Sequence, residues 1–300
     1  MITAQRVATL IANPANPCLT PQIADAARDS VRARAVYFLA DGIACDIPLP
    51  EDTKIAREHI LVALEDISSN LAIDVVVQDA DARRKKVLLA DMDSTLIQQE
   101  CIDELAAEAG VGDRVADITA RAMRGEIEFE PALRERVGLL KGLPLTIIND
   151  VLEKRITLMP GAEQLTATMK AHGAYCALVS GGFTQFTSRI AQRLGFDENR
   201  ANVLGVDGDH LSGEAIPPIL GRQAKVDALE DIIASRNLVA DDVIAVGDGA
   251  NDLAMLARAG SGVALHAKPI VAEQAKMRID HGDLTALLYI QGYRKADFSG

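Results

Sequence analysis

Aromatic residues are scarce in this chain of 300 residues: they make up 3% of it, and tryptophan is absent. Its cores must therefore be built from aliphatic side chains, which are plentiful because hydrophobic residues make up 49% of the chain. No apolar run reaches the ~20 residues that a membrane-spanning helix needs. We therefore expect no membrane partner.

Cysteine is also sparse, and its spacing is uninformative. None of the four cysteines belongs to a C-x-x-C pair, which argues against a zinc or redox motif and favours small buried thiols in a reducing compartment. The N-terminus lacks a basic segment followed by a sufficient apolar one, so we expect no signal peptide and a cytoplasmic location. The cysteines are Cys18, Cys45, Cys101 and Cys176.

Positive charge is in deficit, with 31 Lys and Arg against 43 Asp and Glu and a net charge of −12. No basic stripe interleaved with aromatic residues is present, so nucleic acid is not an expected partner. Salt screens long-range repulsion beyond ~8 Å. A small anionic substrate is therefore compatible with the composition if the pocket supplies local positive charge or a metal.

The length suggests two domains. We place the boundary in the polar run 79–86 and expect domains at 1–82 and 83–300. The first has the order βαββαβ, a ferredoxin-like α+β layout. Its predicted strands are 7–12, 34–40, 43–49 and 71–77, and its helices start at Thr20 and span 54–67, with Asp41-Gly42 as a hairpin turn.

The second domain begins with a buried strand, Val87–Ala90, that ends at Asp91 and Asp93. Open α/β sheets bind ligands at the carboxyl ends of their strands. An Asp-rich turn or helix cap is the alternative for this stretch. Residues 98–155 show no strand pattern, so we expect a helical cap at about 100–157 that closes over this edge.

Three later stretches also place polar groups after apolar strands or at a helix start. Ser180-Gly181-Gly182 follows a strand, and its N–H groups could hold a phosphate, although such a triplet is also a common tight turn. Lys225 lies near the start of a helix, where a cation is unfavourable by ~0.3–1 kcal/mol unless it faces an anion. Asp248 and Asp252 follow another apolar strand.

Two strands that end in carboxylates are costly to place side by side unless a cation is shared. A ligand set of oxygen atoms without His or Cys favours Mg²⁺. Strands alternating with helices predict a doubly wound, mainly parallel α/β sheet.

These four elements, in this order, resemble the haloacid dehalogenase superfamily over about residues 85–295. The resemblance implies that Asp91 is the nucleophile, that Asp93 is the general acid and base, and that Asp91, Asp93 and Asp248 hold Mg²⁺. It also implies that Lys225, Ser180 and Gly181 hold the phosphoryl group. Asn251 would contact substrate and orient Lys225, with Asp252 in support.

Within the superfamily, the cap is similar to that of phosphoserine phosphatases. The resemblance rests on Glu100, Met123, Gly125, Phe129 and Arg136. It implies that O-phospho-L-serine is the substrate, in the last step of serine biosynthesis. Glu100 would bind its amino group, Arg136 its carboxylate, and Phe129 would close over it, with Met123 in support.

The N-terminal layout resembles an ACT domain. The glycine expected in the first βα loop of ligand-binding ACT domains is absent from Asn13–Pro17, so homodimer formation or packing is favoured over amino-acid sensing. Two alternatives for the whole chain remain open. One is a related phosphatase or phosphotransferase for another small phosphate, and the other is a regulatory protein with an inactive catalytic domain. Retention of the aspartates argues against the second.

Overall fold

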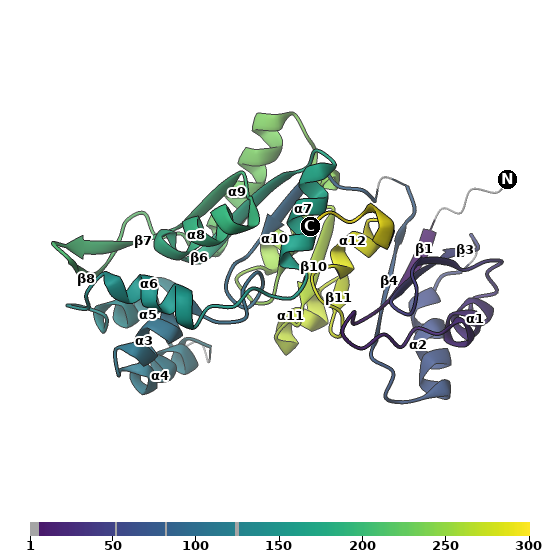
Figure 1. The fold of residues 1–300 in the computed structure, drawn as a ribbon, viewed down its shortest axis with the longest axis horizontal. Coiled ribbons are helices and arrows are strands. Elements are labelled where there is room, and N and C mark those ends of the chain that lie inside the picture. Colours follow the sequence, from purple (N-terminus) through teal and green to yellow (C-terminus); the bar gives the residue numbers. More distant parts are fainter. Residues whose placement is uncertain (1–5, 52, 82, 124–125) are drawn as a thin grey trace. The chain divides into compact units, whose positions relative to one another are not determined.

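The computed structural model describes residues 6–51, 53–81, 83–123 and 126–300. The chain divides into two compact units, each described by itself below. The first comprises residues 1–88, 160–175 and 239–300, and the second 89–159 and 176–238. Figure 1 shows the elements that form them.

The N-terminal part of the first unit has the predicted βαββαβ order. Its four strands form an antiparallel sheet in the order β2-β3-β1-β4. The expected elements are therefore confirmed, with strand and helix starts displaced by one to three residues. The elements are β1 (Arg6–Ala12), α1 (Pro21–Ser30), β2 (Tyr37–Ala40), β3 (Ala44–Leu49), α2 (Ala56–Ile67) and β4 (Ile73–Asp79).

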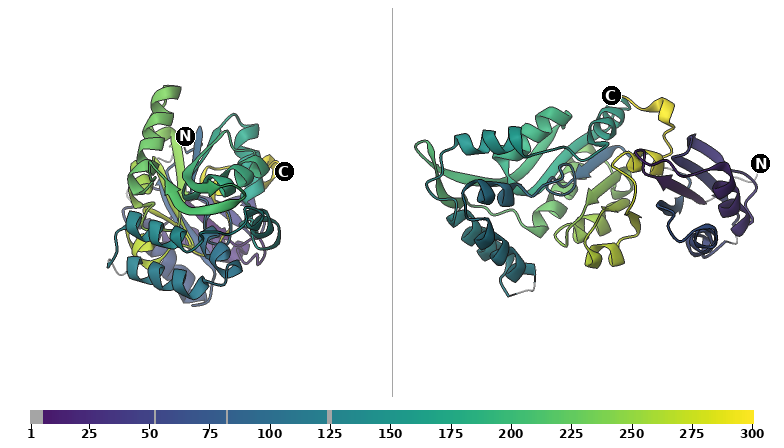
Figure 2. Two further views of the ribbon diagram at one scale, coloured as in Figure 1. Left: turned by 90° about the vertical axis from the view of Figure 1, so that its left-hand side faces the viewer. Right: turned by 60° about the horizontal axis from the view of Figure 1, so that its bottom comes forward.

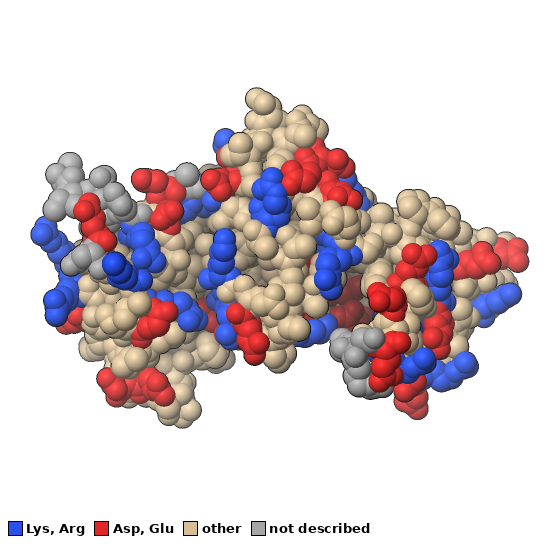
Figure 3. All heavy atoms as spheres, turned by 180° about the vertical axis from the view of Figure 1, so that it is seen from behind, with Lys and Arg blue, Asp and Glu red and all other residues tan. Residues whose placement is uncertain are grey.

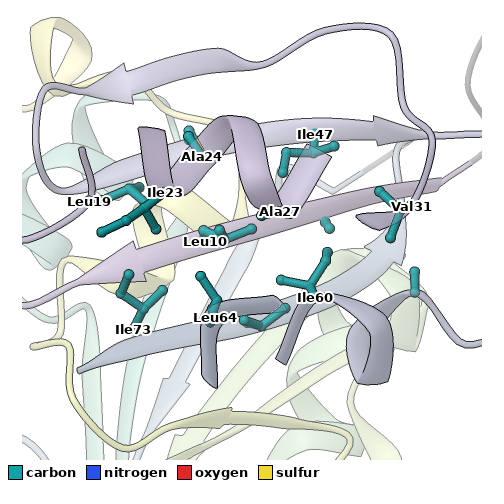
Figure 4. Close-up of a cluster of buried hydrophobic side chains, with 14 of the residues drawn as sticks. Leu10, Leu19, Ile23, Ala24, Ala27, Val31, Ile47, Ile60, Leu64 and Ile73 are labelled. Carbon is teal, nitrogen blue, oxygen red and sulfur yellow. The ribbon is translucent and has the colours of Figure 1, made fainter. Parts of the chain in front are cut away.

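An aliphatic core joins this sheet to α1 and α2, both of which pack on one of its faces (Figure 4). Leu10 and Ile47 point from the strands toward Ile23 and Ile60 on the helices. The Thr20 hydroxyl caps α1 by accepting the N–H of Ile23 at 3.3 Å, as the predicted cap requires. Aliphatic packing thus replaces the missing aromatic residues.

The rest of the first unit is α/β. Its strands follow the order β11-β10-β9-β5, and the β9-β10 and β10-β11 pairs are parallel. The parallel order confirms the expected sheet. Its elements are the start of β5 (Val87–Ala90), α7 (Ala162–Ala171), β9 (Val243–Gly247), α10 (Leu253–Arg258), β10 (Ser261–Leu265), α11 (Pro269–Gln274), β11 (Met277–Ile279) and α12 (Ala286–Ile290).

A buried carboxylate joins the two parts of the first unit. Asp74, on β4, accepts the backbone N–H groups of Asp280 at 2.8 Å, His281 at 3.1 and 3.2 Å, and Gly282 at 2.7 Å. Burial raises the pKa of Asp74, and the three N–H groups oppose this by stabilising the carboxylate. The Gln78 side chain also donates to the carbonyl of Ile290 at 2.6 Å. The division at residue 82 stays a prediction.

The second unit combines a sheet with a group of helices. Its strands follow the order β5-β6-β7-β8, with β6 and β7 parallel and β7 and β8 an antiparallel hairpin. Its elements are the end of β5, α3 (Cys101–Glu108), α4 (Gly112–Met123), α5 (Phe129–Gly138), α6 (Thr146–Lys154), β6 (Tyr175–Phe183), α8 (Thr184–Leu194), β7 (Glu198–Asp207), β8 (His210–Ile216) and α9 (Arg222–Arg236).

Helices α3 to α6 form the predicted helical insert and lie together in both views of Figure 2. One prediction needs refinement. The Ser180-Gly181-Gly182 stretch belongs to β6 rather than to a turn, because β6 continues to Phe183 after a register shift that follows Val179.

The surface carries both signs of charge. On the face drawn in Figure 3, acidic and basic side chains are interspersed. Among the described residues, none of the helices has the length and apolarity needed to span a bilayer.

Replacement of Asp74 by alanine should destabilise the first unit. It would leave the N–H groups of residues 280–282 without their acceptor, at about 1–3 kcal/mol for each group that water cannot reach, and the N–H of Gly282 is the buried one. We expect the free energy of unfolding to fall by about 2–4 kcal/mol in urea titrations followed by circular dichroism. Exposed Asp66, on α2, is the control, and its alanine variant should change this value by less than about 0.5 kcal/mol. Equal effects of the two substitutions would contradict this assignment.

Candidate active site

Asp91 and Lys225 form a buried ion pair in the second unit. Asp91 follows β5, and its Oδ2 lies 2.8 Å from Nζ of Lys225, which projects from the first turn of α9. The other carboxylate oxygen accepts the backbone N–H of Met92 at 2.8 Å. Both side chains are almost inaccessible to solvent. The Asp91 carboxylate is therefore held in one orientation, as a nucleophile requires.

Asp93 lies in a different electrostatic environment from Asp91. Burial, and then the negative charges of Glu100 and Asp91, raise the pKa of Asp93 from 3.8 to about 8. Its Oδ1 also accepts the backbone N–H of Cys101 at 3.1 Å, which partly offsets the shift. Asp93 is therefore protonated at neutral pH and can act as an acid.

The end of β6 approaches Asp93 closely. A Cβ on Gly182 would lie 2.9 Å from Oδ2 of Asp93 and 3.1 Å from Oγ of Ser180, so only glycine fits there without displacing a polar group. The N–H of Gly182 donates to the buried Ser180 hydroxyl at 2.9 Å. The predicted Ser-Gly-Gly stretch thus lies beside Asp93.

Glu100 and Arg136 come from the insert and lie near Asp93. The Ser94 hydroxyl donates to Oε1 of Glu100 at 3.0 Å. Burial lowers the pKa of Arg136, and the negative charges of Asp103, Glu100 and Asp93 act against that shift. The guanidinium is therefore partly desolvated and surrounded by acidic groups.

Phe129, the first residue of α5, contacts two glycine-containing segments. Cβ atoms built on Gly181 and Gly221 would each lie 3.5 Å from its ring. Its side chain remains 39% exposed. The ring therefore covers the end of β6 and the residue that precedes α9.

Asp248, Asn251 and Asp252 belong to the first unit. Asp248 directly follows β9, and its Oδ2 lies 3.5 Å from Nζ of Lys268. Oδ2 of Asp252 accepts the N–H of Gly249 at 3.0 Å, and Oδ1 of Asn251 packs against the same glycine. The predicted acidic motif therefore forms a compact turn after β9.

Asp91 in the second unit, and Asp248 and Asp252 in the first, are each buried and each offer a carboxylate oxygen. This donor set contains oxygen alone, which fits a hard cation such as Mg²⁺. The residues present therefore fit the ion that the sequence predicts.

Two polar residues at the site lacked a recognisable pattern in the sequence. Asn202, on β7, bonds to both the end of β6 and the segment before α9. Lys268 pairs with Asp248. Two residues of the predicted cap site, Met123 through its side chain and Gly125 as a whole, lie outside the described part of the structure.

Comparison with known proteins identifies the class. The family model of haloacid dehalogenase-like hydrolases matches residues 88–257, more than half of the chain. The chain therefore belongs to the haloacid dehalogenase-like hydrolases.

Relatives within this class are phosphoserine phosphatases. The chain is 46% identical to the phosphoserine phosphatase of Lactococcus lactis over 204 residues, which cover 68% of this chain and 94% of that protein. It is 42% identical to that of Archaeoglobus fulgidus over 222 residues, or 73% of this chain and 64% of that protein. It thus spans about three fifths of several longer relatives.

A solved structure extends the likeness to nearly the whole fold. The crystal structure of the probable phosphoserine phosphatase from Vibrio cholerae matches with a TM-score of 0.77 and 31% identity. The match covers 98% of this chain and 88% of the other.

The raised pKa of Asp93 predicts a pH-dependent stability. Because the folded protein binds this proton more tightly than the unfolded chain, the contribution of Asp93 to stability is greatest below the ordinary carboxyl pKa. That contribution falls as the pH rises from about 4 to about 8. In EDTA at pH 8.5, Asp93→Asn should therefore unfold with a free energy higher than that of the wild type by more than about 1.4 kcal/mol, the value of one pKa unit.

The difference should shrink toward pH 5, as measured in urea at a series of pH values. Asp113→Asn, an exposed substitution in the first turn of α4, is the control and should show no such trend between pH 5 and 8.5. A wild-type stability that rises through this range relative to Asp93→Asn would refute the assigned protonation state.

Proposed function

We propose that this chain is a Mg²⁺-dependent phosphoserine phosphatase, which hydrolyses O-phospho-L-serine to serine and phosphate. One observation carries the proposal: an oriented Asp91 carboxylate lies close to Asp93, whose pKa is raised to about 8, and Asp93 in turn interacts with Glu100 and Arg136 of the cap. The similarity to phosphoserine phosphatases supports the choice of substrate.

Asp91 is the proposed nucleophile. Its carboxylate oxygen attacks phosphorus, the bond from phosphorus to the serine oxygen breaks, and an aspartyl-phosphate forms. The proton of Asp93 passes to the departing serine oxygen. Asp93, now a carboxylate, takes a proton from water as the water attacks the aspartyl-phosphate, and phosphate leaves with restoration of Asp91.

Charge repulsion is the main obstacle to the first step. One pair of unit charges 4 Å apart costs ~4 kcal/mol at an effective dielectric constant of 20. Lys225 already neutralises part of the charge of Asp91. The amine of Lys225, the hydroxyl of Ser180 and the N–H of Gly181 would bind the phosphoryl oxygens and stabilise the charge that they gain.

The proposed metal ligands are Asp91, Asp248 and the backbone carbonyl of Asp93. Bound Mg²⁺ would supply positive charge to the phosphoryl oxygens and offset the repulsion between anions. Asp252 would support this arrangement through its bond to the turn after β9, and Asn251 would contact the substrate and orient Lys225.

Selectivity for serine follows from complementary charges. Glu100 would accept the substrate ammonium group, and Arg136 would bind its carboxylate, because a closed site disfavours leaving either charge unpaired. Phe129 would exclude water from the phosphoryl-binding groups, since its ring already covers Gly181 and Gly221.

The N-terminal part, residues 1–82, is proposed as an ACT-like module that mediates homodimer formation. Strand β2 is an edge of its sheet and carries Tyr37, which is 56% exposed. An exposed edge strand with apolar side chains favours pairing with another chain. All four cysteines are free, which agrees with the cytoplasmic location that we propose.

The first test is phosphate release from O-phospho-L-serine, measured with Mg²⁺ and with EDTA. We expect release by the wild type with Mg²⁺, a loss of at least ~10³-fold in EDTA, and recovery when Mg²⁺ is restored. Asp91→Asn should lose activity by a similar factor, because an amide is a poor nucleophile. Asp91-dependent release from other phosphates but not from phosphoserine would keep the mechanism and reject the substrate.

Arg136→Ala tests the selectivity. We expect kcat/KM for phosphoserine to fall by about 10²–10³-fold, since a charged hydrogen bond to the substrate carboxylate is lost. Hydrolysis of p-nitrophenyl phosphate, which has no carboxylate, should fall by less than ~10-fold. Arg134, which pairs with Glu130 on the exposed side of the same helix, is the matched control. Equal losses with the two substrates would argue against the proposed role of Arg136.

A further inference from the structure

We propose that Asn202 is a positioning residue for catalysis, which holds the two segments that bind the phosphoryl group in a fixed relation to each other. This inference rests on the proposed function, because that function gives Ser180, Gly181 and Lys225 their roles. Asn202 itself would not touch the substrate.

The hydrogen bonds of Asn202 are the basis of this proposal. Its side chain is 1% exposed and donates from Nδ2 to the carbonyl of Gly181 at 2.8 Å and to the carbonyl of Leu220 at 3.2 Å. Its Oδ1 accepts the backbone N–H of Leu220 at 2.7 Å. One buried amide thus bonds to three backbone groups in two segments that are separated by about forty residues in sequence.

Both segments carry proposed phosphoryl ligands. Gly181 lies in β6 directly after Ser180, and Leu220 precedes Gly221, the N-cap of α9. Lys225 projects from the first turn of that helix and reaches Asp91. A shift of either segment would therefore move phosphoryl-binding groups relative to the nucleophile.

An amide side chain is specifically required at this position. The two carbonyls need a donor and the N–H of Leu220 needs an acceptor, so only one orientation of the Asn202 amide satisfies all three groups. A carboxylate has no hydrogen to donate to the two carbonyl oxygens. An alanine would leave all three groups unpaired in a buried place.

The position of Phe129 also depends on the segments that Asn202 joins. Its ring contacts Gly181 and Gly221, which lie in or beside the segments that Asn202 joins. Phe129 therefore rests on the same two segments that Asn202 joins. Loss of the amide should disturb closure of Phe129 as well as the binding of phosphate.

The test compares Asn202→Ala and Asn202→Asp with Gln185→Ala as the matched control. Gln185 is also a partly buried amide that bonds to β7, through the carbonyl and N–H of Leu204, but it has no bond to the segment before α9. For each variant, kcat and KM for phosphoserine, the inhibition constant of inorganic phosphate and the melting temperature are measured.

We expect both Asn202 variants to lose about 10–100-fold in kcat, as misplacement by about 1 Å does in other enzymes. The inhibition constant of inorganic phosphate should rise by at least about 10-fold. Gln185→Ala should lower the melting temperature without changing either constant by more than about 3-fold. A residue with a structural role alone would behave like Gln185, and that result for Asn202 would overturn the proposal.

Hydrogen exchange on the wild type gives a test that does not depend on folding of the variants. Inorganic phosphate with Mg²⁺ should slow amide exchange in residues 181–183 and in residues 220–223 together. Protection of only one segment would contradict the proposed coupling. If the wild type releases no phosphate from phosphoserine while the two segments still respond together to inorganic phosphate, the proposed substrate fails and the role of Asn202 stands.

Discussion

The structure of the candidate site depends on how the chain buries carboxylates after β5. A buried carboxylate without a partner is strongly unfavourable, and two close together are worse. The surroundings of Asp91 differ from those of Asp93. Asp91 is paired with Lys225 and bonded to a backbone N–H, whereas Asp93 remains protonated near neutral pH. Two aspartates separated by one residue therefore acquire opposite properties, one an ion-paired carboxylate and the other a carboxyl group that keeps its proton, as the proposed mechanism requires.

This division requires close packing around the site. Gly182 leaves room for Asp93 and for the Ser180 hydroxyl, and the glycine cannot be replaced without displacing one of them. The helical insert contributes Glu100, whose charge helps to keep Asp93 protonated, and Arg136, whose charge opposes it. Residues that would recognise the substrate therefore also adjust the acid, which links recognition and chemistry through electrostatics.

Much of this arrangement could be predicted from the sequence, because strand ends and helix starts have local patterns. The apolar run before Asp91 and the position of Lys225 identified their elements correctly. Asn202 could not be predicted, because its function depends on two distant backbone segments and its sequence neighbours are ordinary strand residues. The continuation of β6 through Ser180-Gly181-Gly182 was also missed, because glycine is disfavoured in strands by local propensity. Here Val179 and Phe183, on either side of this stretch, pair with β7 and keep it in the strand.

The hydrogen bonds from the N–H groups of residues 280–282 to Asp74 limit how the chain can change during evolution. These donors belong to the segment after β11, while their acceptor belongs to β4, so each part completes the hydrogen bonding of the other. A chain that lost residues 1–82 by deletion would have to hydrate these groups or provide a new acceptor. Gain or loss of the N-terminal module therefore changes the hydrogen bonding of residues 280–282, and a simple cut at the boundary is not a neutral event.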